Sequence, residues 1–157
     1  MFPALRPVLN KGGAGRYISR EESVERLRPV IEKHLDLLRA YDHVGKRLSD
    51  ANADQYFREV ILPRLRTELN KLYETIFSLG GSAPTGAEMD WIASGLHGSD
   101  QEMLKGLIER DRAFSGALAT EMDEVHHQER TRAILGHNAE MAEARLGSLR
   151  KLLASLA

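Results

Sequence analysis

The sequence lacks cysteine altogether, although it is 157 residues long. No disulfide, thiolate-bound zinc site or cysteine nucleophile is therefore available, which fits a cytoplasmic protein. The sequence also lacks an excess of charge, because 22 lysines and arginines against 23 acidic residues leave a formal net charge of −1. A chain so nearly neutral creates no strong field for nucleic acid or an anionic membrane, so we expect neither as a partner.

Long apolar runs are missing as well. No uncharged stretch approaches the roughly 18 residues of a membrane span, and Pro3, Arg6 and Pro7 interrupt the apolar residues that a signal peptide would need. No segment alternates apolar and polar residues with β-branched enrichment, so we expect no sheet. Because the first residues are rich in proline and glycine, we predict an irregular N-terminal arm over residues 1–18 and one domain over residues 19–157.

What the chain does have is apolar residues at helical spacing. They begin at Val24 and form four long amphipathic segments, the pattern of helices that pack in a bundle. The first segment is the clearest, and its seam consists of Val24, Leu27, Ile31, Leu38, Tyr41 and Leu48. We expect the first helix to run to about Ser49, the second to end at Gly80-Gly81, the third to end near Met122 and the fourth to reach the C-terminus.

Capping boxes indicate where these helices begin. The pattern pairs a short polar side chain with an acidic or amide side chain three residues later, and it occurs at Ser19–Glu22, Asn52–Gln55, Thr85–Glu88 and Ser99–Glu102. The Thr85 box opens a segment too short for a long helix, since glycines follow at Gly95 and Gly98. The sequence therefore predicts an all-α fold: an antiparallel four-helix bundle with a short extra helix in the middle connection.

Two prolines fall inside predicted helices. Pro29 lies in the first and Pro63 in the second. A proline removes one backbone hydrogen bond and clashes with the carbonyl four residues back. We therefore expect a kink near Arg26–Arg28, or a short helix before the main one, and a second kink near Pro63.

A few turn residues suggest a family. Leu79-Gly80-Gly81 closes one helix, Gly98-Ser99-Asp100 forms a turn, and Glu109-Arg110 follows within the next helix. Together with the helix lengths, these residues resemble the small bacterial ferritin-like bundles of the DUF2383 group, over roughly Val24 to Leu153. The resemblance implies a ferritin-like bundle whose role is not established, with a hint of a stress response. The chain departs from the group on the first helix, where Leu37-Leu38-Arg39 stands in place of acidic residues.

One polar residue lies near the seam of each long helix: His34, Glu68, Asp111 and Asn138, with His137 and Glu140 beside the last. A ferritin-type di-metal centre needs a carboxylate from each of two helices and a Glu-x-x-His pair from each of the other two. This sequence does not supply that set, because its only Glu-x-x-His pair, Glu124–His127, falls in a predicted turn. Three hypotheses remain open: a buried hydrogen-bonded network, a single cation held by His34, Glu68, Asp111 and His137, or scattered exposed side chains.

No catalytic constellation stands out. The serines lie at caps or on outer faces, and basic residues alternate with acidic ones as on a solvated surface. We therefore favour a non-catalytic bundle without a cofactor, which acts through self-association or a protein partner. The alternative is a protein that binds iron or manganese at a degenerate site between the helices.

Overall fold

The computed structural model describes residues 19–86, 93–125 and 129–156. Four long helical segments account for most of these residues, and none of them lies in a strand, which confirms the all-α prediction. The elements are α2 (Arg20–Gly45), α3 (Ala51–Tyr56), the π-helix η1 (Phe57–Ile61), α4 (Leu62–Ser78), α5 (Asp100–Glu124) and α6 (Glu129–Ser155). Within the part of the chain that the structure describes, no helix is long and apolar enough to cross a membrane.

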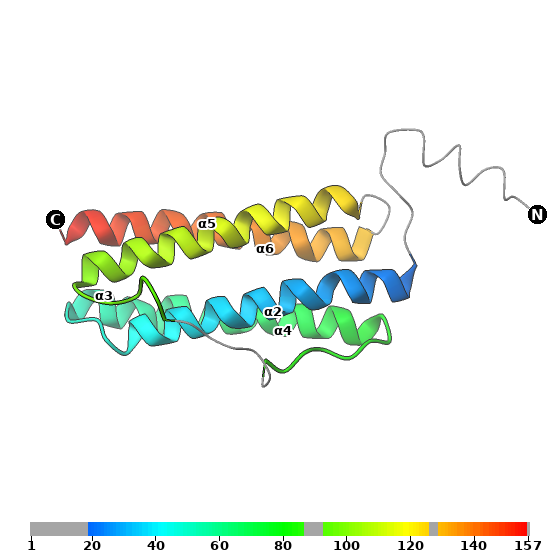
Figure 1. Ribbon diagram of the computed structural model, residues 1–157, viewed down its shortest axis with the longest axis horizontal. Coiled ribbons are helices and arrows are strands. Elements are labelled where there is room, and N and C mark those ends of the chain that lie inside the picture. The colour runs from blue at the N-terminus through cyan, green and yellow to red at the C-terminus, as the bar shows by residue number, and fades with distance from the viewer. Residues whose placement is uncertain (1–18, 87–92, 126–128, 157) are drawn as a thin grey trace, which may run out of the picture.

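The helices form two hairpins that pack face to face (Figure 1). α2 and α4 form one hairpin, α5 and α6 form the other, and α2 also packs on α5 while α4 packs on α6. Each of these neighbouring pairs is antiparallel, so α4 and α5 run in the same direction on opposite corners (Figure 1). The connection between α4 and α5 must therefore return along the length of the bundle, which is the single long crossover of ferritin-like bundles.

The irregularity of the second helix lies just before Pro63. The backbone from Ala51 to Ser78 stays helical, but five residues of it, Phe57–Ile61, form a π-helix in which the N–H of Leu62 bonds to the carbonyl of Phe57. Pro63 has no N–H to donate, and in a regular helix its ring would clash with the carbonyl four residues back, so the regular hydrogen-bond pattern is disfavoured at this point. By contrast, α2 continues through Pro29 as one helix, so the residues from Arg20 to Arg28 do not form a separate short helix.

Two of the four predicted caps are present, and one is wrong. Ser19 and Ser99 accept hydrogen bonds from the N–H groups of Glu22 and Glu102, each at 3.1 Å. The predicted cap at Asn52 is wrong, because Asp50 begins the helix instead and accepts from the N–H of Ala53 at 2.9 Å. α2 ends at Gly45 rather than near Ser49, and residues 46–50 form the turn that leads to the next helix.

At the end of α4, Gly80 adopts a φ of +83°, a conformation that costs glycine little. The N–H of Gly81 then bonds to the carbonyl of Ile76, which ends the helix as predicted. The predicted arm over residues 1–18 lies outside the described residues. So does the middle of the predicted short helix, residues 87–92, and the described residues on either side of this gap are not helical.

The core is a continuous cluster of apolar side chains from all four long helices. The connection before α5 also contributes, since Leu96 is fully buried. Its backbone passes so close to α5 that a Cβ at Gly106 would lie 2.2 Å from the carbonyl oxygen of Gly95. Gly106 therefore marks a place where only glycine fits.

Two glycines of α5 make a matched test of this packing. Gly106→Ala should destabilise the protein by about 1–3 kcal/mol, because the backbone of the connection has to move. Gly116→Ala should stabilise it by about 0.5–1 kcal/mol, because nothing lies within 4 Å of the added methyl group and alanine favours helix. Urea unfolding followed by circular dichroism measures both changes. An equal gain from both substitutions would show that the connection does not pack on α5.

Candidate functional site: a buried arginine between two carboxylates

The centre of the bundle contains a buried ion-pair network around Arg145 of α6. Its Nε and Nη2 atoms donate to Oδ2 and Oδ1 of Asp111 on α5, at 2.6 and 2.8 Å. Its Nη1 atom donates to both carboxylate oxygens of Glu68 on α4, at 3.0 and 3.2 Å. One guanidinium group therefore joins carboxylates from two diagonally opposite helices.

Tyr41 completes the network from α2. Its hydroxyl donates to Oδ2 of Asp111, and the guanidinium carbon of Arg145 lies 5.7 Å from the centre of its ring. The ring is held in turn by Phe57 of the π-helix, with the two ring centres 5.9 Å apart. All four oxygens of the two carboxylates thus accept at least one hydrogen bond from Arg145, and Asp111 accepts one more from Tyr41.

The charges of this network are almost completely removed from water. Side-chain exposure is 5% for Arg145, 3% for Glu68 and 0% for Asp111. Burial alone would lower the pKa of Arg145, but the hydrogen bonds and charge of Asp111 more than offset it, so the net pKa is raised and the guanidinium stays charged. Burial raises the pKa of the Glu68 carboxyl, an effect that Arg145 opposes.

His34 lies beside the network as a neutral side chain. Its Nε2 atom is 3.0 Å from the carbonyl oxygen of Leu65, so the proton belongs on Nε2 and the bond is a donation. Its Nδ1 atom is buried without a hydrogen-bond partner among the described residues. Burial is the largest cause that lowers the pKa of His34 to about 4. The structure therefore favours the uncharged form of His34.

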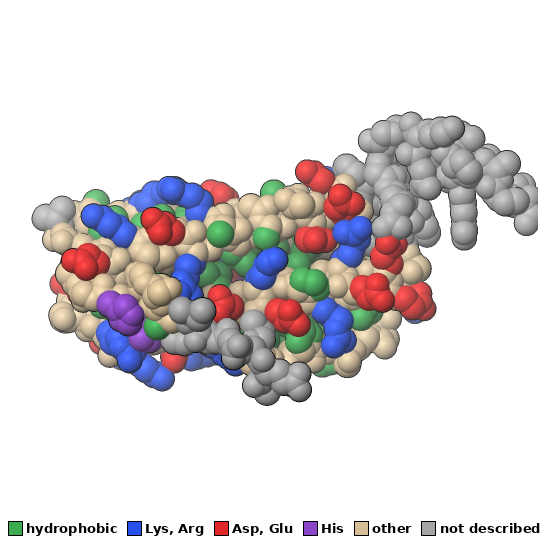
Figure 2. Space-filling view, in the orientation of Figure 1, with side chains coloured by type: hydrophobic (Ala, Val, Ile, Leu, Met, Phe, Trp, Pro, Cys, Tyr) green, Lys and Arg blue, Asp and Glu red, His purple; other side chains and the backbone are tan. Residues whose placement is uncertain are grey.

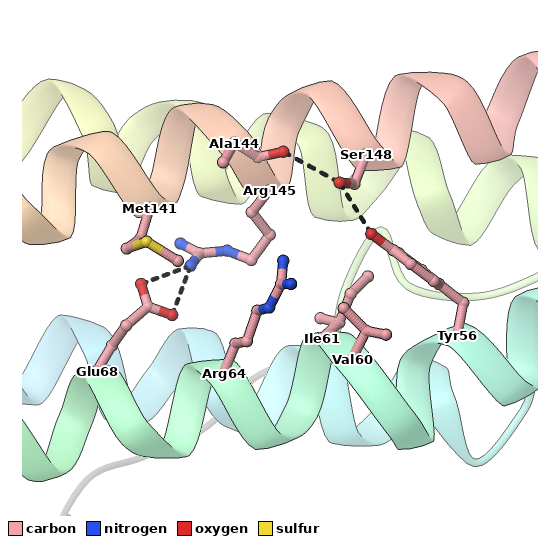
Figure 3. A pocket seen from close by; sticks show the side chains of 9 residues that line it. All are labelled: Tyr56, Val60, Ile61, Arg64, Glu68, Met141, Ala144, Arg145 and Ser148. Carbon is pink, nitrogen blue, oxygen red and sulfur yellow. Dashed lines mark hydrogen bonds and ion pairs between the residues drawn. The ribbon is translucent and has the colours of Figure 1, made fainter.

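A narrow crevice leads from the surface to the network between α4 and α6 (Figure 3). Arg64 and the hydrogen-bonded pair Tyr56 and Ser148 line it, and the Glu68–Arg145 ion pair lies along the same crevice (Figure 3). Its free volume is about 20 Å³, which is room for about one water molecule. The crevice can admit solvent to Glu68 but is too small for an organic substrate.

The structure brings together three of the four residues predicted as metal ligands. His34, Glu68 and Asp111 are all buried near the centre of the bundle. His137 instead lies near the surface, where its Nε2 atom is 3.3 Å from Nζ of Lys71. Asn138 is buried, but its Nδ2 atom donates to the carbonyl of Ile134, one turn back on its own helix.

Sequence reasoning missed the two residues that organise the network, Arg145 and Tyr41. Both lie on or beside a seam, and Tyr41 follows His34 by seven residues, which places them on one face of α2. The available signal was an arginine on the seam of α6 facing acidic seam residues on two other helices. The histidine of the Glu-x-x-His pair, His127, lies outside the described residues.

No family model matches this chain, and no curated protein is similar to it in sequence. Solved structures do match. A two-domain protein from Anabaena variabilis, with DJ-1/ThiJ/PfpI-like and ferritin-like domains, aligns over 88% of this chain with a TM-score of 0.72 and 14% identity. The chain spans 38% of the length of that protein.

A ferritin-like, diiron-carboxylate protein from Bacillus anthracis aligns over 85% of this chain and 96% of its own, with a TM-score of 0.70 and 16% identity. Likeness at this level of identity defines the fold and nothing further. The protein is an all-α, ferritin-like four-helix bundle. The narrower resemblance to the DUF2383 group stays a prediction.

The described residues do not fit a di-metal centre. Such a centre takes its ligands from all four helices, two of which supply Glu-x-x-His pairs. Here α6 directs an arginine into the core, and the buried carboxylates of the described residues, Glu68 and Asp111, are both bonded to it. Among the described residues, no three histidine or acidic side chains are grouped to hold a metal ion. The single cation site that includes His137 stays a prediction.

The neutral state of His34 gives a pH prediction. A folded-state pKa of about 4 lies below the unfolded value of 6.5, so the unfolded chain takes up the proton first as pH falls. His34 should therefore cost about 3 kcal/mol of stability between pH 6.5 and pH 4. The raised pKa of Glu68 acts in the opposite direction, since protonation of a buried carboxyl favours the folded state.

The contribution of Glu68 cancels when wild type is compared with His34→Leu at each pH. As pH falls from 6.5 to 4, the free energy of unfolding should decrease less for the variant than for wild type. The difference between the two decreases should reach about 3 kcal/mol at pH 4. His97→Leu, which changes an exposed side chain, serves as the control and should follow wild type. Parallel curves for wild type and His34→Leu would mean that His34 is not buried in its neutral form.

Proposed function

We propose that this protein is a non-catalytic ferritin-like bundle that acts by associating with itself or with another protein. The observation that carries the proposal is the closed centre, where Arg145 is bonded to both buried carboxylates. A catalytic metal site keeps an open coordination position for substrate. Here every carboxylate oxygen already accepts a hydrogen bond, and the crevice beside it holds about one water molecule.

The surface supports a protein partner rather than a nucleic acid. Basic and acidic side chains are interspersed over the face shown in Figure 2, which creates no patch of a single sign. Among the described residues, one large apolar side chain is exposed: Phe77, near the end of α4, with 59% of its surface accessible. Its ring stacks on that of Tyr73, and the ring centres are 6.3 Å apart. Exposed aromatic side chains are common at protein interfaces.

The second candidate is the metal-binding bundle. It is favoured by the likeness to a protein described as diiron-carboxylate and by the burial of His34, Glu68 and Asp111 in one region. It requires Arg145 to leave the carboxylates, because the guanidinium and a divalent cation would compete for the same oxygens. A role in a stress response is compatible with either candidate and stays a prediction.

One experiment separates the candidates: size-exclusion chromatography with light scattering, and elemental analysis of the same peak, on protein purified without added metal. We expect a dimer or larger assembly containing far less than one iron or manganese per chain. Phe77→Ser should shift the assembly toward monomer, because it removes the exposed apolar contact. Glu74→Ser, one turn away on the same helix and also exposed, should leave it unchanged.

Iron or manganese near one or two per chain would overturn the proposal in favour of the metal-binding bundle. A wild-type monomer at all concentrations would exclude self-association. In that case the partner has to be a different protein.

A further inference from the structure

We infer that the guanidinium of Arg145 replaces the metal ions of a ferritin-like centre: it is a cation, covalently supplied by the chain itself, that holds the carboxylates of α4 and α5 together. This inference rests on the proposed function only in assuming that the wild-type centre contains no metal.

The need for a cation follows from the geometry. Glu68 and Asp111 project from the two diagonal helices, which lie on opposite corners of the bundle (Figure 1). Both carboxylates are buried, and two buried negative charges that face each other repel strongly unless a positive charge lies between them. In di-metal bundles that positive charge is bound metal. Here it is Arg145, whose side chain is 5% exposed.

A buried histidine beside the network adds a polar atom that has no partner in the described part of the chain. His34 is fully buried, and its Nδ1 atom has no hydrogen-bond partner among the described residues. Since Nε2 carries the proton, Nδ1 presents a free lone pair. Carboxylate oxygens and neutral imidazole nitrogens are ligands that manganese, iron, cobalt and zinc accept. With Arg145 in place, no three such side chains of the described residues are grouped to hold an ion. While Arg145 is present, its charge and volume keep such an ion out.

Removing the guanidinium should therefore create a metal site. In Arg145→Ala the carboxylates of Glu68 and Asp111 lose their counter-charge, and the crevice between α4 and α6 opens onto the space that the side chain filled (Figure 3). A divalent cation entering there would restore the lost positive charge. Arg145→Lys keeps a positive charge in the chain and should not gain a site.

The test is a titration of wild type, Arg145→Ala and Arg145→Lys with Mn²⁺, Co²⁺ and Zn²⁺. Thermal unfolding is followed for each metal, and visible absorption for Co²⁺. At a metal concentration 100 times Kd, the midpoint of Arg145→Ala should rise by roughly 5–10 °C. Wild type and Arg145→Lys should not respond. Arg64→Ala, which removes an arginine lining the same crevice, is the matched control and should behave as wild type.

A second variant shows where the metal binds. Adding Glu68→Gln to Arg145→Ala removes one charged ligand and should weaken binding at least tenfold. An Arg145→Ala protein that responds to none of the three metals would overturn the inference, and so would an equal response from wild type.

Arg145→His covers the case in which Arg145→Ala does not fold without metal. Failure of both variants to fold in the presence of any of the three metals would also contradict the inference, because a bound cation should substitute for the guanidinium. The outcomes remain distinct from those of the proposed function. Iron or manganese in the wild-type protein refutes that proposal, whereas an unresponsive Arg145→Ala refutes only the present inference.

Discussion

The structure depends on the ion pairs that Arg145 makes in the centre of the bundle. Removing one partner of a buried ion pair typically costs about 3–5 kcal/mol, because it leaves an uncompensated charge in the core. Here a single guanidinium serves two carboxylates, so its loss would strand both Glu68 and Asp111. Tyr41 adds a fourth helix to the same network. The network therefore links side chains from all four long helices in the core.

The surrounding fold positions these groups. The long crossover places α4 and α5 on opposite corners, so that α6 is a neighbour of both (Figure 1). Arg145 of α6 can therefore reach the carboxylates of both helices. The π-helix before Pro63 places Phe57 against the ring of Tyr41, which orients the hydroxyl toward Asp111. A π-helix is rare and often lies at a functional site. In this protein it lines the crevice that leads to Glu68.

Helical spacing was enough to predict the bundle, while the capping boxes and the glycine pair predicted two of its serine caps and the helix end at Gly80-Gly81. The spacing did not show how the inner polar residues are paired. It also identified His34, Glu68 and Asp111 as polar residues on the inner faces. It could not identify their partner, because spacing gives the face of a helix but not the reach of a long side chain. Arg145 and His137 lie near the same seam of α6, yet one is buried and the other bonds to Lys71 near the surface. The π-helix and the Asp50 cap depend on local backbone geometry that the apolar pattern does not encode.

The protein thus combines a ferritin-like fold with a centre that is held by a side chain. The most direct test is to measure hydrogen exchange at Nε–H of Arg145 by nuclear magnetic resonance at neutral pH, with and without added Zn²⁺. The account predicts a slowly exchanging proton, since this group donates to Asp111 at 2.6 Å in the core, and no change when zinc is added. A rapidly exchanging proton, or a signal displaced by stoichiometric zinc, would contradict the account.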